Sequence, residues 1–449
     1  MPGMSTVPKK ELSLFDSTCM IVGIIVGVGI YMSAPIVAGS MGSWQGMLTI
    51  WLVGGIVAMC GALCYGELAG TYPQHGGEYV YLSRAYGPWA GFLFGWAKLF
   101  IIRPGNIALA AFTFARYAKT LCAPLEGWEP LCAAAAVTVL TVVNILGVTE
   151  GKWTQNALTI LKALGLLAIV AVGLAAATRA PAADPPSAVT LGGVQLAMIL
   201  VLYTFGGWSE IGYIAAEVKR PERTIARALI IGVLSVTVLY VLVNSAFLHA
   251  LGYANMAASE AVAVDTVATT FPSTGSKLVA MLVCVSALGA LNGIIFTGSR
   301  VSYAMGADHA PLRWLGRWSA RFGTPVWALC VQGALSLGIV LLAQSFLKTL
   351  EYMTPVVWVF FLGTGIGIFV LRRKEPETER PFRTPGYPFT PIVFCASCAF
   401  MLYSGIAWSL SQSHVALPVG VGFVLVGAVV YALTGRRRPT HRAQAPDKD

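Results

Sequence analysis

The stretch IVGIIVGVGIYMSAP, residues 21–35, decides the fold of this chain. It is apolar enough to lie in a lipid bilayer, yet Gly23, Gly27 and Gly29 interrupt it. Because glycine inside a helix costs about 1 kcal/mol relative to alanine, an unwound turn is favoured here. Unwound backbone at bilayer depth lines a cavity or binds a ligand, as in the interrupted helices of secondary transporters. The alternative is close helix packing through small residues.

The composition is that of a membrane protein. Of the 449 residues, 56% are hydrophobic and 11% are charged, whereas soluble domains carry about 25% charged residues. A membrane span needs about 20 apolar residues. We therefore predict an all-α polytopic membrane protein with twelve transmembrane helices. Their expected limits are 14–39, 46–71, 88–117, 128–148, 154–178, 192–217, 225–250, 276–305, 325–345, 351–371, 389–409 and 415–434.

The basic residues orient the chain. The net charge is +10, and with a cytoplasmic N-terminus 22 of the 30 Lys and Arg residues fall on inner loops and tails and 5 on outer segments. This bias follows the positive-inside rule, so the charge indicates orientation and no nucleic-acid partner. We expect a multi-pass protein of the cell inner (plasma) membrane. Cytoplasmic tails at 1–11 and 436–449 are expected to flank one transporter domain at 12–435.

A second interrupted segment lies in the sixth predicted span. Gly206 and Gly207 break the stretch VLYTFGGWSEIGY, residues 201–213, at a position that corresponds to the glycines of the first span. Two interrupted helices, one in each half of the chain, indicate a transporter substrate site. An odd number of spans per half makes the halves inverted. We expect a 5+5 inverted repeat with broken helices 1 and 6, with repeats at 12–178 and 192–371 and two further helices at 389–434.

Three basic side chains lie inside predicted spans: Lys98, Arg103 and Lys162. A charge at the bilayer centre costs about 2.5–3.5 kcal/mol on insertion scales, so Arg103 is expected to face the bundle interior or water. Lys162 is isolated among apolar neighbours. Carbonyls freed at a helix break are suitable acceptors for its ammonium, and so are hydroxyls of span eight such as Ser286. Snorkelling to the interface is the alternative for Lys162.

No catalytic or metal motif is present. The nine cysteines fall mostly in apolar spans, where a buried thiol acts as a small hydrophobic side chain. Cys395 and Cys398 form a CxxC without second ligands, which is weak evidence for a metal. Cys122 and Cys132 flank an outer loop, and a disulfide between them is the less favoured alternative. Without HExxH, GxSxG or paired carboxylates, we expect no enzyme, metal or cofactor.

Six motifs follow one another along residues 12–435: GVGIYMSAP at 27–35, CYGELAGTYPQHGGEYVYL at 64–82, RPGNIALAAFTFARY at 103–117, TFGGWSEIGYIAAEVKRPERTIARAL at 204–229, LNGIIFTGSR at 291–300 and ERPFRTPGYPFTP at 379–391. In this order and spacing the chain resembles the amino acid–polyamine–organocation (APC) superfamily, and within it bacterial members of the L-type amino acid transporter (LAT) family. The set is specific, although any one glycine motif is a weak signal. The resemblance implies a LeuT-like fold and transport by alternating access.

The resemblance also implies a binding site for an amino acid at the two breaks. In relatives the carboxylate lies on amides of the first break, here residues 28–30. The amino group meets carbonyls of both broken helices, here around Gly23 or Ile24, Tyr203 and Gly206. Helix N-termini favour anions and C-termini favour cations, which fits both assignments. The candidate substrate-binding residues are Gly23, Ile24, Gly27, Val28, Gly29, Ile30, Tyr203, Gly206, Ser209 and Glu210.

The resemblance also gives particular roles to Lys162 and to several of these binding residues. Tyr203 falls on an aromatic gate, and Lys162 falls on the lysine that takes the place of sodium in many members. Val28 departs from the pattern, because many relatives have a serine there. Gly206 stands where relatives with dibasic substrates carry Asp, which favours neutral cargo, whereas Glu210 is an acid close to the site. Eukaryotic members pair with a single-span glycoprotein through an outer-loop cysteine, and no such partner is expected here.

The sequence therefore predicts a sodium-independent amino acid transporter that exchanges neutral L-amino acids. Within transport, the alternative is a proton-coupled permease that uses Lys162 or Glu210, or a permease for cationic amino acids or polyamines. From another class, a membrane amino-acid sensor would share the site. A sensor would be expected to carry an added signalling domain.

Overall fold

The computed structural model describes residues 10–122, 127–176, 189–342, 346–412 and 416–434. Within these ranges the chain is almost entirely helical, and its β-structure is a single isolated bridge between Leu12 and Val218. The all-α prediction is confirmed. Most of the predicted N-terminal tail and all of the C-terminal tail lie outside the described residues.

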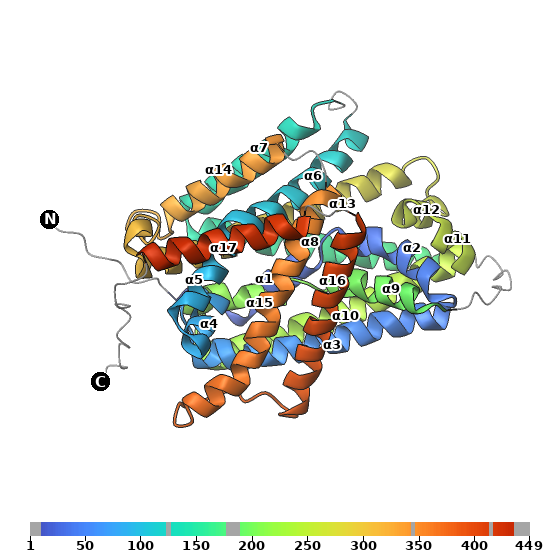
Figure 1. Ribbon diagram of the computed structural model, residues 1–449. Helices are drawn as coiled ribbons and strands as arrows, with labels where there is room; N and C mark the ends of the chain where they lie inside the picture. The colour runs from blue at the N-terminus through green and yellow to red at the C-terminus, as the bar shows by residue number, and fades with distance from the viewer. Residues whose placement is uncertain (1–9, 123–126, 177–188, 343–345, 413–415, 435–449) are drawn as a thin grey trace.

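Helices make up most of the described chain (Figure 1). In chain order they are α1 (Leu14–Ile25), α2 (Gly29–Met41), α3 (Trp44–Thr71), α4 (Glu78–Tyr86), α5 (Pro88–Ala97), η1 (Lys98–Ile102), α6 (Arg103–Leu121), α7 (Glu129–Leu146), α8 (Val148–Ala175), α9 (Leu191–Thr204), η3 (Trp208–Glu217), α10 (Pro221–Leu251), α11 (Tyr253–Ala258), α12 (Val262–Ala268), α13 (Gly275–Asp308), η4 (Ala310–Leu312), α14 (Val326–Leu342), α15 (Phe346–Lys374), α16 (Phe389–Gln412) and α17 (Ala416–Thr434).

Many of these helices can cross a membrane. In the described ranges nine are long and apolar enough, and α1 with α2 adds a tenth if the bent pair forms one span. Two shorter apolar helices, within α14 and α17, stand where spans nine and twelve are predicted. The polytopic architecture is confirmed. The count of twelve and the inverted repeat stay predictions.

The first predicted break is present between α1 and α2. α1 ends at Ile25 and α2 begins at Gly29, and the two helices are bent by 49° relative to each other. Across the break, the amide of Gly27 donates to the carbonyl of Ile25 at 2.7 Å, in a turn tighter than the helical pattern. The chain therefore changes direction where the glycines predicted an unwound turn.

The second predicted break is present between α9 and η3. α9 ends at Thr204, and after the turn at 205–207 the chain continues as a 3₁₀ helix of 10 residues. Gly207 has a φ of +118°, which glycine adopts without the steric penalty of a side chain. Runs of 3₁₀ helix this long are uncommon and often mark a functional hinge, so η3 is a second structural irregularity beside the break itself.

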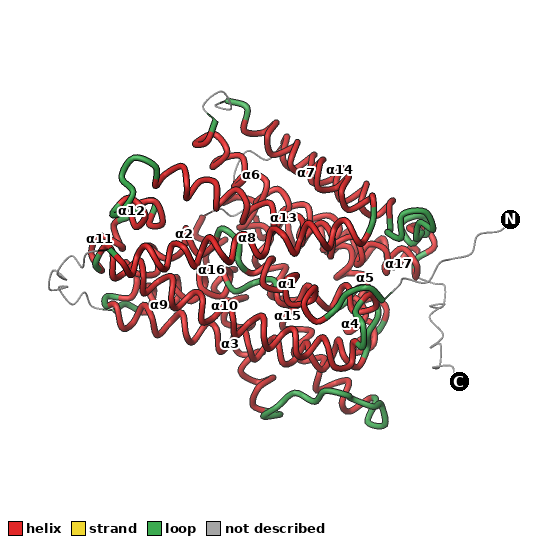
Figure 2. The backbone as a smooth tube through the Cα atoms, turned by 180° about the vertical axis from the view of Figure 1, so that it is seen from behind, coloured by secondary structure: helices red, strands yellow, loops and turns green. Residues whose placement is uncertain are grey.

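The broken helices stand inside the bundle. Most helices run along one direction of the molecule, with α4 at one end and α11 and α12 at the other (Figures 1 and 2). α1 packs against α8, α10, α13 and η3, while α2 packs against α9. The packing brings the two broken spans together from the two halves of the chain.

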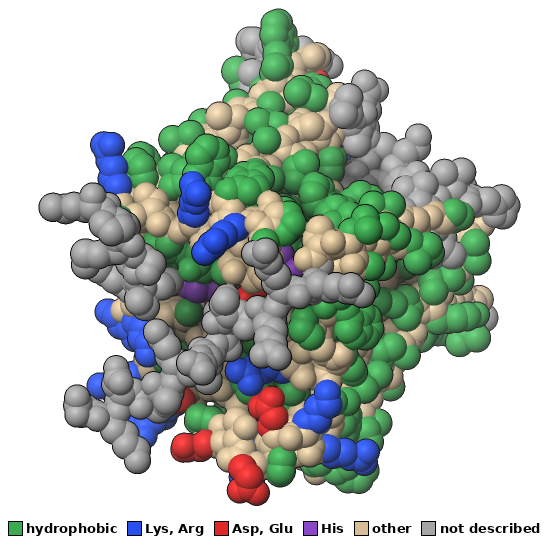
Figure 3. All heavy atoms as spheres, turned by 60° about the vertical axis from the view of Figure 1, so that its left-hand side comes forward, with side chains coloured by type: hydrophobic (Ala, Val, Ile, Leu, Met, Phe, Trp, Pro, Cys, Tyr) green, Lys and Arg blue, Asp and Glu red, His purple; other side chains and the backbone are tan. Residues whose placement is uncertain are grey.

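The surface combines an apolar flank with charged parts. In Figure 3, hydrophobic side chains cover much of the right-hand part, while Lys and Arg side chains gather on the left-hand and lower parts. Large exposed apolar side chains occur on many helices, for example Leu164 of α8 and Val238 of α10. Because soluble proteins rarely expose apolar patches of this extent, we assign the apolar flank to contact with lipid.

Candidate functional site

The two breaks lie against each other. A Cβ atom on Gly207 would lie 2.7 Å from Cγ2 of Ile24 and 3.3 Å from the amide nitrogen of Ile25. The end of α1 therefore rests on the turn before η3, an approach that a side chain would prevent. The hydroxyl of Tyr240, on α10, lies 2.9 Å from the Ile25 carbonyl and 3.4 Å from the Thr204 carbonyl. One buried side chain thus holds both breaks.

The start of α2 presents open amide groups. Among the described residues, no acceptor takes the amides of Val28, Gly29 or Ile30, and the first intrahelical bond runs from Tyr31 to the Val28 carbonyl at 3.1 Å. Open amides at a helix N-terminus attract an anion. The geometry therefore fits the predicted carboxylate position. Gly29 has a packing role as well, since a Cβ there would lie 2.9 Å from the Thr204 hydroxyl.

The end of α1 presents carbonyl groups, and most of them are occupied. The carbonyls of Gly23 and Val26 accept hydrogen bonds from Lys162, and that of Ile25 accepts from Tyr240. Within the described chain, the carbonyl of Ile24 has no such donor. Of the two carbonyls predicted to meet a substrate amino group on this helix, only Ile24 is open.

Lys162, on α8, is completely buried and fully hydrogen bonded. Its ammonium donates to the carbonyls of Gly23 at 2.7 Å, Val26 at 2.9 Å and Ser286 at 3.0 Å. The predicted bond to a hydroxyl of span eight is wrong, because the hydroxyl of Ser286 turns instead to the Val26 carbonyl at 3.2 Å. Lys162 and Ser286 nevertheless meet at the first break, where both were predicted to act.

Gly289, on α13, makes room for this lysine, and the sequence analysis missed it. A Cβ atom there would lie 2.8 Å from both Cε and Nζ of Lys162. Gly289 lies three residues after Ser286 in the same apolar helix. A glycine one helical turn from a polar residue, in the span expected to face the lysine, is the signal that would have identified it.

The residues predicted on the second broken helix take different environments. Tyr203 is 39% exposed, whereas Ser209 is buried on η3. The amide of Gly206 donates to the Tyr203 carbonyl at 3.0 Å. That carbonyl is therefore engaged within the turn, which weakens its predicted role as an acceptor for the substrate. The Tyr203 side chain remains accessible beside the break.

Glu210 is buried in an ion pair. Its carboxylate contacts the guanidinium of Arg103, and the hydroxyl of Thr297 on α13 lies 2.5 Å from the same oxygen. Lys98 lies 3.9 Å from the other oxygen. Arg103 thus faces the bundle interior, as predicted. Glu210, the acid that stood against a neutral substrate in the sequence, therefore already has basic side chains of the protein beside it.

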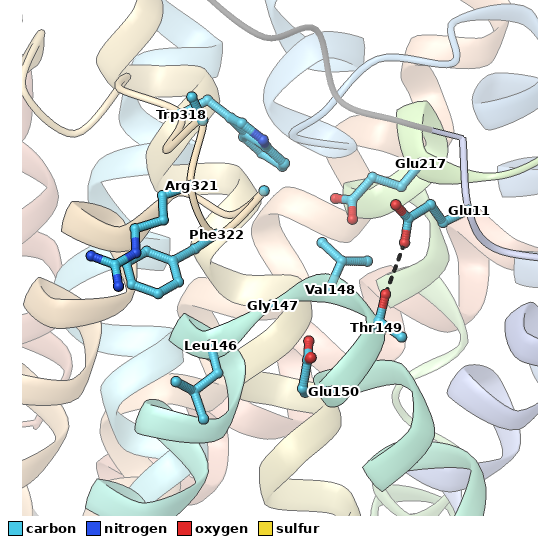
Figure 4. Close-up of a pocket in the computed structure, with 12 residues that line it drawn as sticks. Glu11, Leu146, Gly147, Val148, Thr149, Glu150, Glu217, Trp318, Arg321 and Phe322 are labelled. Carbon is cyan, nitrogen blue, oxygen red and sulfur yellow. Dashed lines mark hydrogen bonds between the residues drawn. The ribbon is translucent and has the colours of Figure 1, made fainter.

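A cavity of about 380 Å³ lies near the starts of α1 and α8 and the end of η3 (Figure 4). None of the predicted binding residues lines it. Its polar lining includes the carboxylates of Glu11, Glu150 and Glu217 and the guanidinium of Arg321, and Thr149 donates to Glu11 at 3.3 Å. The cavity is therefore polar and is separate from the breaks.

Beside this cavity, α1 and η3 are tied together at their ends. The amides of Glu11 and Leu12 both lie 2.9 Å from the Glu217 carbonyl, and the Leu12 carbonyl accepts from the amide of Lys219 at 2.8 Å. The Glu217 carboxylate forms a buried pair with Arg300 at 2.8 Å. His75 lies 3.7 Å from Glu217, and burial lowers the pKa of this histidine to about 4. The ring is therefore neutral at physiological pH.

Residues 12–432 match the family described as amino acid permease. The b(0,+)-type amino acid transporter 1 of Mus musculus is 31% identical over 438 residues, which cover 96% of this chain and 88% of the mouse protein. The serine/threonine exchanger SteT of Bacillus subtilis is 31% identical over 431 residues, 94% of this chain and 96% of that protein. The large neutral amino acids transporter small subunit 2 of Mus musculus is 32% identical over 445 residues, which cover 95% of this chain and 81% of the mouse protein.

Proposed function

This chain belongs to the amino acid permease family, and on that premise we propose that it exchanges neutral L-amino acids across the cell inner membrane without sodium. Amino acid transport by a multi-pass membrane protein is common to the family and the relatives. The substrate class, the independence from sodium and the location are the proposal. In the proposed cycle, the two broken helices expose the site first to one side of the membrane and then to the other.

The observation that carries this proposal is the polarity of the first break. Open amides stand at the start of α2, and the open carbonyl of Ile24 stands at the end of α1. The first group attracts an anion and the second attracts a cation. An α-amino acid carries a carboxylate and an ammonium on one carbon. The break therefore offers complementary groups to the part that all amino acids share.

The occupied state of Glu210 supports a neutral substrate. Its carboxylate is paired with Arg103 and bonded by Thr297, so a cationic substrate would not find a free acid there. Lys162 supports independence from sodium, because its ammonium fills the set of carbonyls on which a cation would bind. We also propose cytoplasmic termini, on the charge bias of the loops. Transport by the chain alone is a further part of the proposal.

Reconstitution of the purified chain in lipid vesicles tests the proposal. Labelled neutral amino acids are expected to enter vesicles that are loaded with unlabelled amino acid, at the same rate in sodium and in choline buffer. Empty vesicles and protein-free vesicles should show no such uptake. Concentrative uptake into empty vesicles under an imposed proton gradient would instead support a proton-coupled permease, and binding without flux would support a sensor.

Tyr203→Ala is expected to slow exchange more than it weakens binding. The ring is large, is accessible and lies about one turn before the Gly206 break, so it is placed to cover a bound substrate. Closure of such lids often limits turnover. Exchange rates and equilibrium binding are compared with those of Tyr403→Ala, a change of the same size on the exposed face of α16. Lost binding with unchanged turnover would make Tyr203 a wall of the pocket.

A further inference from the structure

A π turn in the third predicted span brings two cations together. η1 is a π-helix at Lys98–Ile102, and the amide of Arg103 donates to the Lys98 carbonyl five residues earlier. Pro104 explains the wider turn, because it has no amide hydrogen and its ring crowds the carbonyl four residues before it. In a π turn the hydrogen bond joins residues five apart, which leaves them on the same side of the helix, and such turns are frequent at functional sites. Lys98 and Arg103 therefore share a face of this helix.

Both cations point to Glu210 on η3, but they do so unequally. Arg103 contacts one carboxylate oxygen directly, whereas the ammonium of Lys98 lies 3.9 Å from the other. Lys98, Arg103 and Glu210 are 5%, 1% and 6% exposed, so water does little to replace a missing partner. One buried carboxylate thus has one close cation and one distant cation.

Among the described residues, Lys98 has no acceptor within hydrogen-bond distance. In the described part of the chain, its ammonium makes no hydrogen bond, although an ammonium can donate three. The rings of Tyr213 and Phe94 lie 4.8 Å and 5.6 Å from it. The other acid nearby, Glu78 of α4, accepts from the Tyr213 hydroxyl at 2.9 Å through one oxygen, and its other oxygen is unpartnered. Lys98 is therefore available to a carboxylate that moves toward it.

We propose that Arg103 and Lys98 are two alternative docking positions for Glu210 as η3 moves along this helix during transport. The proposal rests on the proposed function, since η3 must move for the site to open to both sides. Because the Lys98 ammonium already lies 3.9 Å from one Glu210 oxygen, a small displacement of η3 is enough to bring the carboxylate into hydrogen-bond contact with Lys98. A second cation one π turn away keeps the buried carboxylate paired at both ends of the step. Lys98 and Arg103 are thus positioning residues that act through Glu210.

Lys98→Gln tests the proposal, because it removes the second docking position and leaves the Arg103–Glu210 pair intact. Substrate affinity in detergent should be unchanged, while the exchange rate falls about tenfold or more, since the transition now leaves a buried charge unpaired. Lys98→Arg should restore the rate. Lys119→Gln is the matched control: Lys119 lies in the last turn of α6, in a surface pair with Glu129 at 3.2 Å. It should leave both affinity and rate unchanged.

A double-mutant cycle separates this role from a structural one. In a Glu210→Gln background, Lys98→Gln should have no further effect on the rate, because no carboxylate remains that could change its partner from Arg103 to Lys98. An equal loss in both backgrounds overturns the proposal, and so does failure of Lys98→Arg to restore the rate. Recovery of the rate in a Lys98→Gln, Glu78→Gln double variant would also overturn it, by assigning the effect to Glu78.

Exchange by the wild-type chain distinguishes failure of the docking proposal from failure of the proposed function. If it exchanges amino acids and Lys98→Gln does so equally fast, only the docking proposal falls. If the wild-type chain does not exchange, the proposed function falls and the docking proposal falls with it. Should Glu210→Gln not yield folded protein, the comparison of Lys98→Gln with Lys98→Arg decides the matter alone.

Discussion

Lys162→Ala is expected to abolish exchange in a chain that still inserts into the membrane. The side chain joins α8 to the end of α1 and to α13 through three hydrogen bonds of 2.7 to 3.0 Å. Its removal leaves buried carbonyls without a donor, and each such group costs about 1–3 kcal/mol. The first break is then free to change shape. Both the open amides and the Ile24 carbonyl would lose the geometry that binds an amino acid.

Exchange and equilibrium binding of Lys162→Ala decide this prediction, with Lys277→Ala as the control. Lys277 lies on α13 with its side chain exposed, so losing its charge should leave both measurements unchanged. Lys162→Met adds a variant that keeps most of the side-chain volume. It should be as inactive as alanine, because the ammonium is what the carbonyls require. Normal exchange by Lys162→Met would show that volume, and not charge, holds the break.

The three hydrogen bonds of Lys162 also bear on whether transport is coupled to protons. The ammonium of Lys162 has three donors, and three carbonyl oxygens accept them. Such a set favours a lysine that stays charged, since a neutral amine would leave an acceptor unfilled. We therefore expect exchange that does not respond to an imposed pH gradient. Concentrative uptake by the wild-type chain under a proton gradient alone would contradict this expectation.

The breaks and their acceptors could be predicted because they depend on local chemistry. Glycine weakens a helix wherever it stands in the interior, and a buried ammonium needs acceptors that an unwound turn supplies. The identity of the third acceptor could not be predicted. Whether the carbonyl or the hydroxyl of Ser286 faces Lys162 depends on the rotation of α13, and a helix with polar residues on several sides does not reveal that rotation.

The Arg103–Glu210 pair shows where a sequence signal existed and was not used. Both are charged residues within predicted spans, 107 positions apart, and buried charges in membrane proteins usually pair with each other. That rule alone would have joined them. Pro104 is a local signal for an irregular turn, but a proline inside a helix can equally kink or end it, so the π turn that brings Lys98 to the same carboxylate could not be predicted. The role of Tyr240 could not be predicted either, because its hydroxyl bonds both breaks only once they are in contact.

Gly207→Ala is expected to separate the two broken helices and to eliminate substrate binding. Alanine would meet two penalties at this position. Its φ of +118° is unfavourable for a residue with a side chain, at about 1–2 kcal/mol, and the new methyl group would lie 2.7 Å from Ile24. Overpacking of this kind costs about 1–3 kcal/mol. Because Ile24 carries the open carbonyl, the displaced group is one that we propose binds the substrate ammonium.

Thermal unfolding and ligand binding in detergent check this prediction against Gly192→Ala. Gly192 lies on α9 in the same predicted span, and a Cβ atom there would have no neighbour within 4 Å. The control should therefore keep the stability and affinity of the wild type, whereas Gly207→Ala should lose both. Wild-type affinity in Gly207→Ala, with a lowered Tm, would show that the contact between the breaks stabilises the fold without forming the site. The ammonium would then have to bind elsewhere than at the end of α1.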